Sequence, residues 1–112
     1  MEKNNIFAVA FEKSNEEIFE TILQKSGCRI ERIISRGHKS PEGFWYDQDE
    51  TEWVMLVQGQ AGLRFEGQDH VTILNPGDYL QIDRHTRHRV EWTSPDCDTL
   101  WLAVHIAHKD QD

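Results

Sequence analysis

The sequence predicts a mostly β protein in which short strands close into a sandwich or barrel, with one helix on the N-terminal side. Two observations support this fold class. At least seven short segments after residue 28 alternate their side chains with a period of two. One segment before them carries apolar residues at helical spacing. A length of 112 residues is enough for one domain, in which residues 1–28 supply a strand and the helix and residues 29–108 form the barrel.

The predicted helix spans residues 14–26. It opens with a capping box, in which Ser14 is the cap and Glu17 follows three residues later. Gly27 can end the helix, because glycine readily takes the backbone conformation of a helix C-terminus. We expect the helix to pack against the outside of the barrel through four apolar side chains, those of Ile18, Phe19, Ile22 and Leu23.

Recognisable turns connect the predicted strands. Gly67, Gln68 and Asp69 form a hairpin turn, and the turn over residues 75–78 places Gly77 where a positive φ is expected. Many short strands without a second helix are typical of a closed β architecture. The strands are expected at residues 29–34, 53–58, 62–66, 70–74, 79–82, 88–92 and 99–106.

The charge balance excludes some classes of partner. Lys and Arg number 12 and Asp and Glu number 20, which gives a net charge of −8. Such a chain is a poor partner for nucleic acid or an anionic membrane surface. No apolar run approaches the roughly 20 residues of a membrane span, and residues 1–5 lack the apolar region of a secretory signal. We therefore expect a cytoplasmic protein with Cys28 and Cys97 as reduced thiols.

Two stretches of the chain share their spacing with a known family. In the first, Glu52 stands at the start of an apolar strand and Gly59 at its end; in the second, Gly77 opens a strand and His88 follows eleven residues later. This pairing resembles the two motifs of the cupin superfamily, and the chain is similar to small single-domain cupins of the cupin-2, RmlC-like type. The resemblance covers residues 43–92. It implies a double-stranded β-helix, the cupin or jelly-roll barrel, in which the two motifs face each other and can hold a divalent metal.

The resemblance implies Glu52 and His88 as metal ligands, because both stand at motif positions. Both histidines of the first motif are absent, so the third ligand is Gln48 or Asp47. Gln48 shares the strand face of Glu52. Asp47 is the better donor chemically but reaches that face only through a bulge. Imidazole and carboxylate ligands suit Fe, Mn, Ni, Zn or Cu.

Two structural roles compete with metal binding. Glu52 could be a carboxylate at the barrel rim that pairs with Arg64 or Arg87. His88 could be a core histidine bonded to a backbone carbonyl group. Both alternatives stay open at the level of the sequence.

Several side chains are expected around a cavity. Tyr46 and His85 are candidates for a catalytic acid or base, although His85 in its loop at the barrel mouth could also be a solvated or gating residue. Trp92 shares the strand face of His88, and His105 is in period with Trp101. If these faces point inward, the tryptophans give the cavity an aromatic wall suited to a small molecule.

Three functions fit these residues. The first is a metal-dependent enzyme acting on a small molecule, of the oxygenase, isomerase or lyase type. The second is a non-catalytic module that binds a small molecule or a metal, and the third is a metal-free scaffold with a filled barrel. A homodimer is expected as well, because the strand at residues 29–34 and the apolar segment 6–11 would leave edge and apolar surface exposed in a lone barrel.

Overall fold

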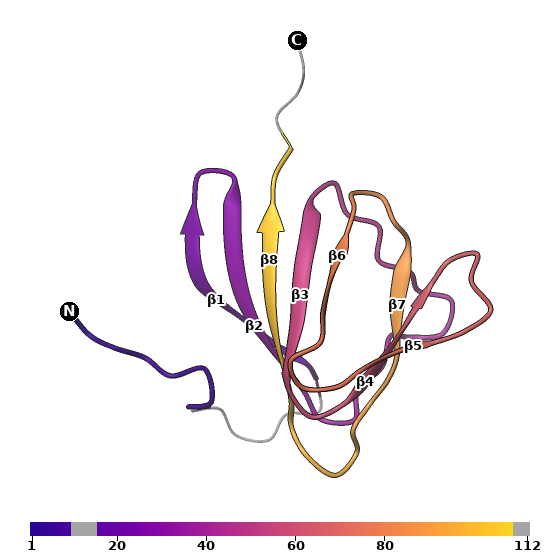
Figure 1. The fold of residues 1–112 in the computed structure, drawn as a ribbon, viewed down its shortest axis with the longest axis horizontal. Helices are drawn as coiled ribbons and strands as arrows, with labels where there is room; N and C mark the ends of the chain where they lie inside the picture. The colour runs from indigo at the N-terminus through magenta and orange to yellow at the C-terminus, as the bar shows by residue number, and fades with distance from the viewer. Residues whose placement is uncertain (10–15, 109–112) are drawn as a thin grey trace.

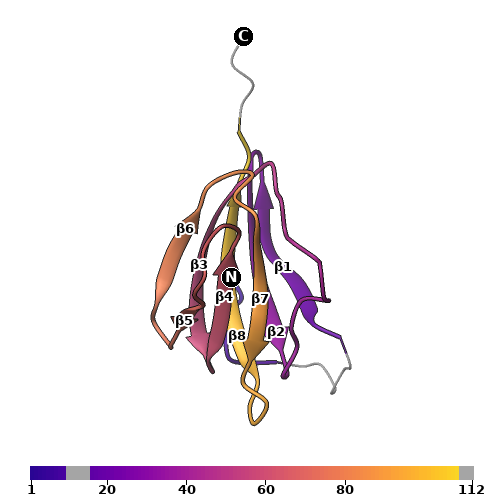
Figure 2. The same cartoon turned by 90° about the vertical axis from the view of Figure 1, so that its right-hand side faces the viewer.

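The computed structural model describes residues 1–9 and 16–108 of the chain. Two antiparallel sheets face each other across one core (Figures 1 and 2). The larger sheet has the strand order β1-β2-β8-β3-β6 and the smaller sheet has the order β5-β4-β7. The mostly β fold class is confirmed. In chain order the strands are β1 (Ile18–Lys25), β2 (Cys28–Ser35), β3 (Thr51–Gln58), β4 (Ala61–Phe65), β5 (Thr72–Leu74), β6 (Tyr79–Ile82), β7 (His88–Thr93) and β8 (Thr99–Ile106).

The seven strands predicted after residue 28 are all present. The predicted bounds of β6 and β8 agree with the structure to the residue, and those of the others differ by one or two residues at an end. Gly77 has a φ of +94° in the turn before β6, as its place in the sequence indicated. The period-two signal was therefore reliable over most of the chain.

The predicted N-terminal helix is wrong. Ile18–Lys25 forms the strand β1, which pairs antiparallel with β2, while Ser14 lies outside the described residues. Lys25 pairs with Cys28, so the expected helix terminator Gly27, with a φ of +75°, belongs to a two-residue hairpin turn. The part of the chain that the structure describes contains no helix, and so none that is long and apolar enough to cross a membrane.

A bulge explains why this strand has the apolar spacing of a helix. The register between β1 and β2 shifts between Thr21 and Leu23. As a result Ile18 and Leu23, five positions apart, pair with Ile34 and Ile30, which lie on one face of β2. The edge of β2 offers hydrogen bonds along a whole strand, and this tertiary pairing overrides a weak local helix preference.

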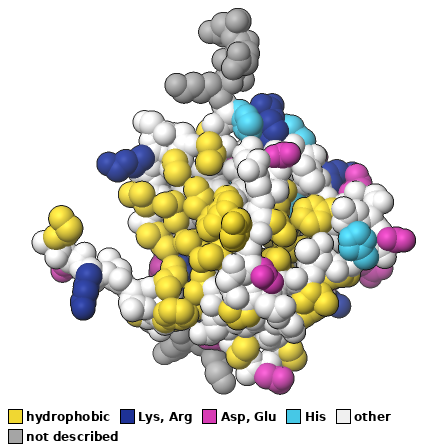
Figure 3. Space-filling model, in the orientation of Figure 1, with side chains coloured by type: hydrophobic (Ala, Val, Ile, Leu, Met, Phe, Trp, Pro, Cys, Tyr) yellow, Lys and Arg dark blue, Asp and Glu magenta, His cyan; other side chains and the backbone are white. Residues whose placement is uncertain are grey.

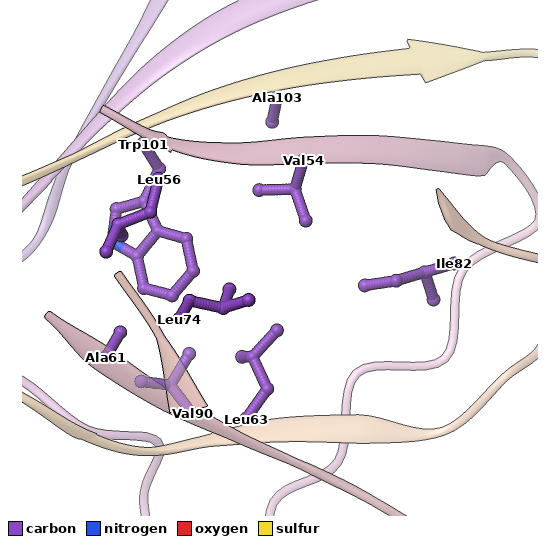
Figure 4. Close-up of a cluster of buried hydrophobic side chains, with 9 residues drawn as sticks. All are labelled: Val54, Leu56, Ala61, Leu63, Leu74, Ile82, Val90, Trp101 and Ala103. Atoms are coloured by element: carbon purple, nitrogen blue, oxygen red, sulfur yellow. The ribbon is translucent and has the colours of Figure 1, made fainter. Parts of the chain in front are cut away.

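The core fills the space between the two sheets. Its side chains come from β3, β6 and β8 on one side and from β4, β5 and β7 on the other, and they point toward one another (Figure 4). Each is almost fully buried, which is the main source of favourable free energy for a small domain. The cluster consists of Val54, Leu56, Ala61, Leu63, Leu74, Ile82, Val90, Trp101 and Ala103.

The inner face of the larger sheet changes character along its length. The inward residues of β3 include Glu52 at one end and Leu56 near the other, and cross-strand pairing sets Glu52 beside His105 and Leu56 beside Trp101. All four side chains are buried. One end of the barrel is therefore filled by apolar groups, and the other end carries ionisable ones.

The outer face of the larger sheet is apolar. Met55 pairs with Leu102 and Trp53 pairs with Val104, and these half-buried residues alternate along their strands with the buried inward ones. Figure 3 shows hydrophobic side chains gathered over this part of the molecule, where β8 and β3 lie in Figure 1. Apolar patches of this kind are typical of surfaces that contact another molecule.

Arg32 holds the N-terminal segment against the same face. Its Nη1 donates hydrogen bonds to the carbonyl oxygens of Ile6 and Ala8, each at 3.0 Å, and Nη2 pairs with Glu20. Arg32 is itself buried. The guanidinium group therefore satisfies backbone acceptors that no strand pairs.

Candidate functional site

A cavity of about 150 Å³ lies at the ionisable end of the barrel. Val54, Leu63, Ile82, Val90 and Trp101 form its apolar wall, and all five also belong to the core in Figure 4. Trp101 thus lines a cavity as the sequence indicated. The remaining lining includes ionisable side chains from β2, β3, β7 and β8.

Glu52 and His88 face each other in this cavity. Glu52 Oε1 lies 3.8 Å from His88 Nε2, and the two residues are 7% and 5% exposed. His88 Nδ1 lies 2.8 Å from the carbonyl oxygen of Thr86. Because a carbonyl oxygen can only accept a hydrogen bond, Nδ1 carries a hydrogen and Nε2 is the atom presented to Glu52.

The geometry bears on both structural alternatives for this pair. Arg64 lies 3.9 Å from Glu91 and Arg87 lies 3.0 Å from Glu66, so neither arginine pairs with Glu52. His88 does bond to a backbone carbonyl, as the alternative proposed. That bond fixes the ring and leaves Nε2 in the cavity, where it faces Glu52.

Burial raises the pKa of the Glu52 carboxyl above its ordinary value, and the positive charge that His105 and His88 can carry opposes this effect. The negative charges of Glu31 and Glu50 add to the rise. A raised pKa makes the Glu52 carboxylate a better proton acceptor than an ordinary glutamate.

Tyr46 stacks on His88. The two ring centroids are 5.5 Å apart with an angle of 24° between the planes, and the backbones form an isolated bridge in which Tyr46 N donates to His88 O at 2.7 Å. Burial, followed by the charges of Glu17 and Glu52, raises the pKa of the Tyr46 hydroxyl. Tyr46 therefore keeps its proton and serves as a hydrogen-bond donor at the cavity.

His105 forms a second polar cluster beside the first. Its Nε2 lies 2.9 Å from Glu31 Oε1, and its Nδ1 lies 3.7 Å from Glu50 Oε1. Arg29 binds both oxygens of Glu50, at 3.1 and 3.3 Å. The register places His105 between Arg29 on β2 and Glu52 on β3. Sequence reasoning identified His105 but missed Arg29 and Glu31, whose positions depend on strand pairing, and Glu50, which directly precedes β3.

The two candidates for a third ligand lie in different places. Gln48 lines the cavity, and its Oε1 is buried without a hydrogen-bond partner among the described residues. Asp47 is exposed and lies 2.8 Å from His85 Nδ1. His85 also lies 3.3 Å from Asp49 and is not part of the cavity lining. The structure therefore brings Gln48 to the site but neither Asp47 nor His85.

Trp92 was expected beside His88 in the cavity, but the structure places it elsewhere. The register between β4 and β7 shifts between Gly62 and Leu63, so that Gly62 pairs with Trp92 while Leu63 pairs with Val90. This bulge reverses the direction of the side chains that follow it on β7. The Trp92 ring consequently lies over Gly62, outside the cavity lining.

The donor set fits a resident transition metal poorly. In residues 1–9 and 16–108, no three side chains of His, Cys, Asp or Glu come together as a metal site. Glu52 and His88 are suitable donors, but Gln48 offers only a neutral amide oxygen. Catalytic metal sites generally have three imidazole, carboxylate or thiolate ligands.

Comparison with known proteins places the fold in a family. The model of the cupin domain family matches residues 33–105. A protein of Ralstonia eutropha, provisionally named a mannose-6-phosphate isomerase, is 45% identical to this chain, with a TM-score of 0.91. The alignment covers 96% of this chain and 100% of that one. Among proteins with curated descriptions, none matches.

More distant structures share the fold. A cupin superfamily protein of Desulfitobacterium hafniense has 16% identity and a TM-score of 0.71, with 88% of this chain and 84% of that chain covered. An RmlC-like cupin of Desulfovibrio desulfuricans has the same identity and TM-score, with 96% of each chain covered. At such low identity the similarity concerns the barrel and not its chemistry.

Proposed function

The chain belongs to the cupin family, and from its cavity we propose that it is an isomerase that moves a proton within a small hydroxy-carbonyl compound. The observation that carries this proposal is the buried pair of Glu52 and His88, whose facing atoms lie 3.8 Å apart. The provisional name of the 45% identical relative supports the same type of reaction.

Glu52 and His88 can perform both halves of the reaction, and together they hold one transferable proton at every stage. With the proton on His88, the Glu52 carboxylate removes the hydrogen from the carbon next to the substrate carbonyl, and His88 Nε2 gives its proton to the carbonyl oxygen. The substrate becomes an enediol, Glu52 becomes protonated and His88 neutral. Glu52 then delivers its proton to the former carbonyl carbon while His88 Nε2 takes the proton of the other hydroxyl group. The carbonyl has moved by one carbon, and the pair is restored.

The surroundings of the pair suit this sequence of steps. The raised pKa of Glu52 makes its carboxylate a stronger base toward a carbon-bound hydrogen than an ordinary glutamate. The bond from His88 to Thr86 keeps Nε2 directed at the substrate. The Tyr46 hydroxyl can donate a further hydrogen bond to an enediol oxygen, because it stays protonated.

Hydrogen exchange with solvent tests the proposal. The protein is incubated with glyceraldehyde or mannose in D₂O, and deuterium at the carbon next to the carbonyl is followed by NMR. We expect Glu52→Gln and His88→Gln each to lower the exchange rate by about 10²–10⁴-fold, the usual contribution of acid–base catalysis. Glu42→Gln, an exposed control away from the cavity, should leave the rate unchanged. Exchange that survives in both site variants would disprove the role of the pair.

A non-catalytic binding module is the second candidate. Its support is that Tyr46 and Gln48 occupy the cavity where, by resemblance, the family carries histidines, so the cavity is poor in ionisable groups on that side. A binder should gain thermal stability from its ligand while showing no deuterium exchange. Stabilisation together with exchange identifies the enzyme.

A further inference from the structure

We propose that the cavity selects an uncharged, hydroxyl-rich molecule of a few carbons and rejects its phosphorylated form. This inference rests on the proposed function, because it names the substrate class of the same site. It departs from what the name of the Ralstonia relative would suggest, since that name contains a sugar phosphate.

The charges on the lining oppose an anion. Glu17, Glu31 and Glu52 contribute carboxyl groups to the cavity, whereas Arg29 is the one Lys or Arg among its described lining residues. The Arg29 guanidinium is already engaged, at 3.1 and 3.3 Å from the two oxygens of Glu50 and 3.7 Å from Glu31. A phosphate entering here would lose its hydration and meet three carboxyl groups, with no free Lys or Arg to compensate and only the single proton held by Glu52 and His88 against them.

The free hydrogen-bonding atoms of the cavity also favour hydroxyl groups. Gln48 Oε1 is buried without a partner and can only accept. His105 is 4% exposed, and its Nδ1 has no hydrogen-bond partner, with Glu50 Oε1 at 3.7 Å. When His105 carries its single hydrogen on Nε2 toward Glu31, its Nδ1 also only accepts, so hydroxyl groups can satisfy both atoms by donating to them. The oxygens of a phosphate dianion only accept, so Gln48 Oε1 would stay unsatisfied.

The size of the cavity also favours a small molecule without a phosphate group. Its volume is about 150 Å³. Cavities for larger ligands measure about 300–1,000 Å³. A short polyol or hydroxyaldehyde can place its carbons against Val54, Leu63 and Val90 and its hydroxyl groups toward the polar side. A phosphate added to such a molecule would share the cavity with the carboxyl groups of Glu17 and Glu31.

Matched pairs of compounds test the proposal on the intact protein. Binding of glyceraldehyde and glyceraldehyde 3-phosphate, and of mannose and mannose 6-phosphate, is measured by isothermal titration calorimetry. We expect at least one uncharged member to bind in the millimolar range or tighter, and its phosphate ester at least about tenfold more weakly, a difference of about 1.4 kcal/mol. Equal or tighter binding of the esters overturns the proposal, and so does a failure of every uncharged member to bind.

Charge variants separate selectivity from catalysis. Glu17→Gln should narrow the difference within each pair by several-fold, because it removes one lining carboxylate. Glu42→Gln, with an exposed carboxyl outside the cavity, should not change it. An unchanged preference in Glu17→Gln argues against the charge mechanism. Selective binding of the uncharged compounds without deuterium exchange would refute the isomerase proposal but not the selectivity. Deuterium exchange with the phosphate esters only would refute the selectivity but not the isomerase proposal.

Discussion

A chain of hydrogen bonds links the core to the rim of the cavity. Its middle residue is Ser35, and replacing this residue tests both bonds of the chain at once. Trp101 Nε1 donates to Ser35 Oγ at 3.1 Å, and Ser35 Oγ donates to Glu17 Oε2 at 2.6 Å. Ser35 is fully buried and Trp101 is 4% exposed. The substitution Ser35→Ala removes the shared oxygen and interrupts both bonds, while it leaves almost the same volume in place.

The cost of Ser35→Ala follows from the two bonds. The indole N–H of Trp101 would stay buried without an acceptor, which costs about 1–3 kcal/mol. The bond to Glu17 ends on a carboxylate, and bonds to charged groups contribute about 1.5–3 kcal/mol. Glu17 is only half-buried, however, so we take the lower part of this range. Together these effects predict a loss of about 2–4 kcal/mol in the free energy of unfolding.

Urea unfolding followed by tryptophan fluorescence measures this loss. The double variant Trp101→Phe with Ser35→Ala is the matched control, because it removes the donor as well as the acceptor. The double variant should therefore lose less than the sum of the two single substitutions, by about 1 kcal/mol or more. A loss below about 0.5 kcal/mol in Ser35→Ala, or strict additivity, would refute the hydrogen-bond chain. Because Ser35→Ala removes the hydrogen bond to Glu17, this variant should also show a smaller preference for the uncharged compounds over their phosphate esters.

Three further predictions concern other parts of the molecule. Because the pKa of Glu52 is raised in the fold, the wild type should lose stability relative to Glu52→Gln as the pH rises above the ordinary glutamate pKa of about 4.3; a constant difference in unfolding free energy would contradict this. In Gly62→Ala the new methyl group would lie 2.7 Å from Val71 Cγ1 and 2.8 Å from Trp92 Cε2, so we expect a loss of about 1–3 kcal/mol, part of it recovered when Trp92 is also replaced by Leu. The homodimer stays a prediction, now assigned to the outer apolar face: light scattering should give a dimer for the wild type and a monomer for Leu102→Lys, and a monomeric wild type would argue against it.

The sequence predicted the strands well because a two-layer barrel imposes a simple rule. Each strand buries one face, so its apolar residues recur with a period of two wherever the pairing is regular. Glu52 and Val54 follow this rule, and both side chains are buried. The same rule failed at β1 and at Trp92, where bulges insert an extra residue. A bulge is a feature of the pairing between two strands, so one strand's sequence does not reveal it.

The missed part of the site has a related cause. Strand β2 carries Arg29 and Glu31 on its inner face and Arg32 on its outer face. Because charged residues occur on both faces of β2, the alternation along this strand does not indicate which face points inward. The sequence of β2 therefore could not show which of these side chains reach the cavity. The answer depends on the pairing of β2 with β8, which sets Arg29 beside His105. Motif positions identified Glu52 and His88 without this information, because the family resemblance carries the three-dimensional pairing with it.

The position of His85 explains which of two neighbouring side chains enters the cavity. His85 has a φ of +59°, which is costly for a residue with a side chain. Its backbone N–H donates to the Gln48 carbonyl oxygen at 2.7 Å, and its Nδ1 lies 2.8 Å from Asp47. These contacts offset the strained backbone and draw Asp47 outward. Since neighbouring side chains of an extended segment point in opposite directions, Gln48 then turns inward. Although His85 lies outside the cavity, its contacts thus favour the arrangement in which the Gln48 amide, and not the Asp47 carboxylate, lies on the side of Glu52.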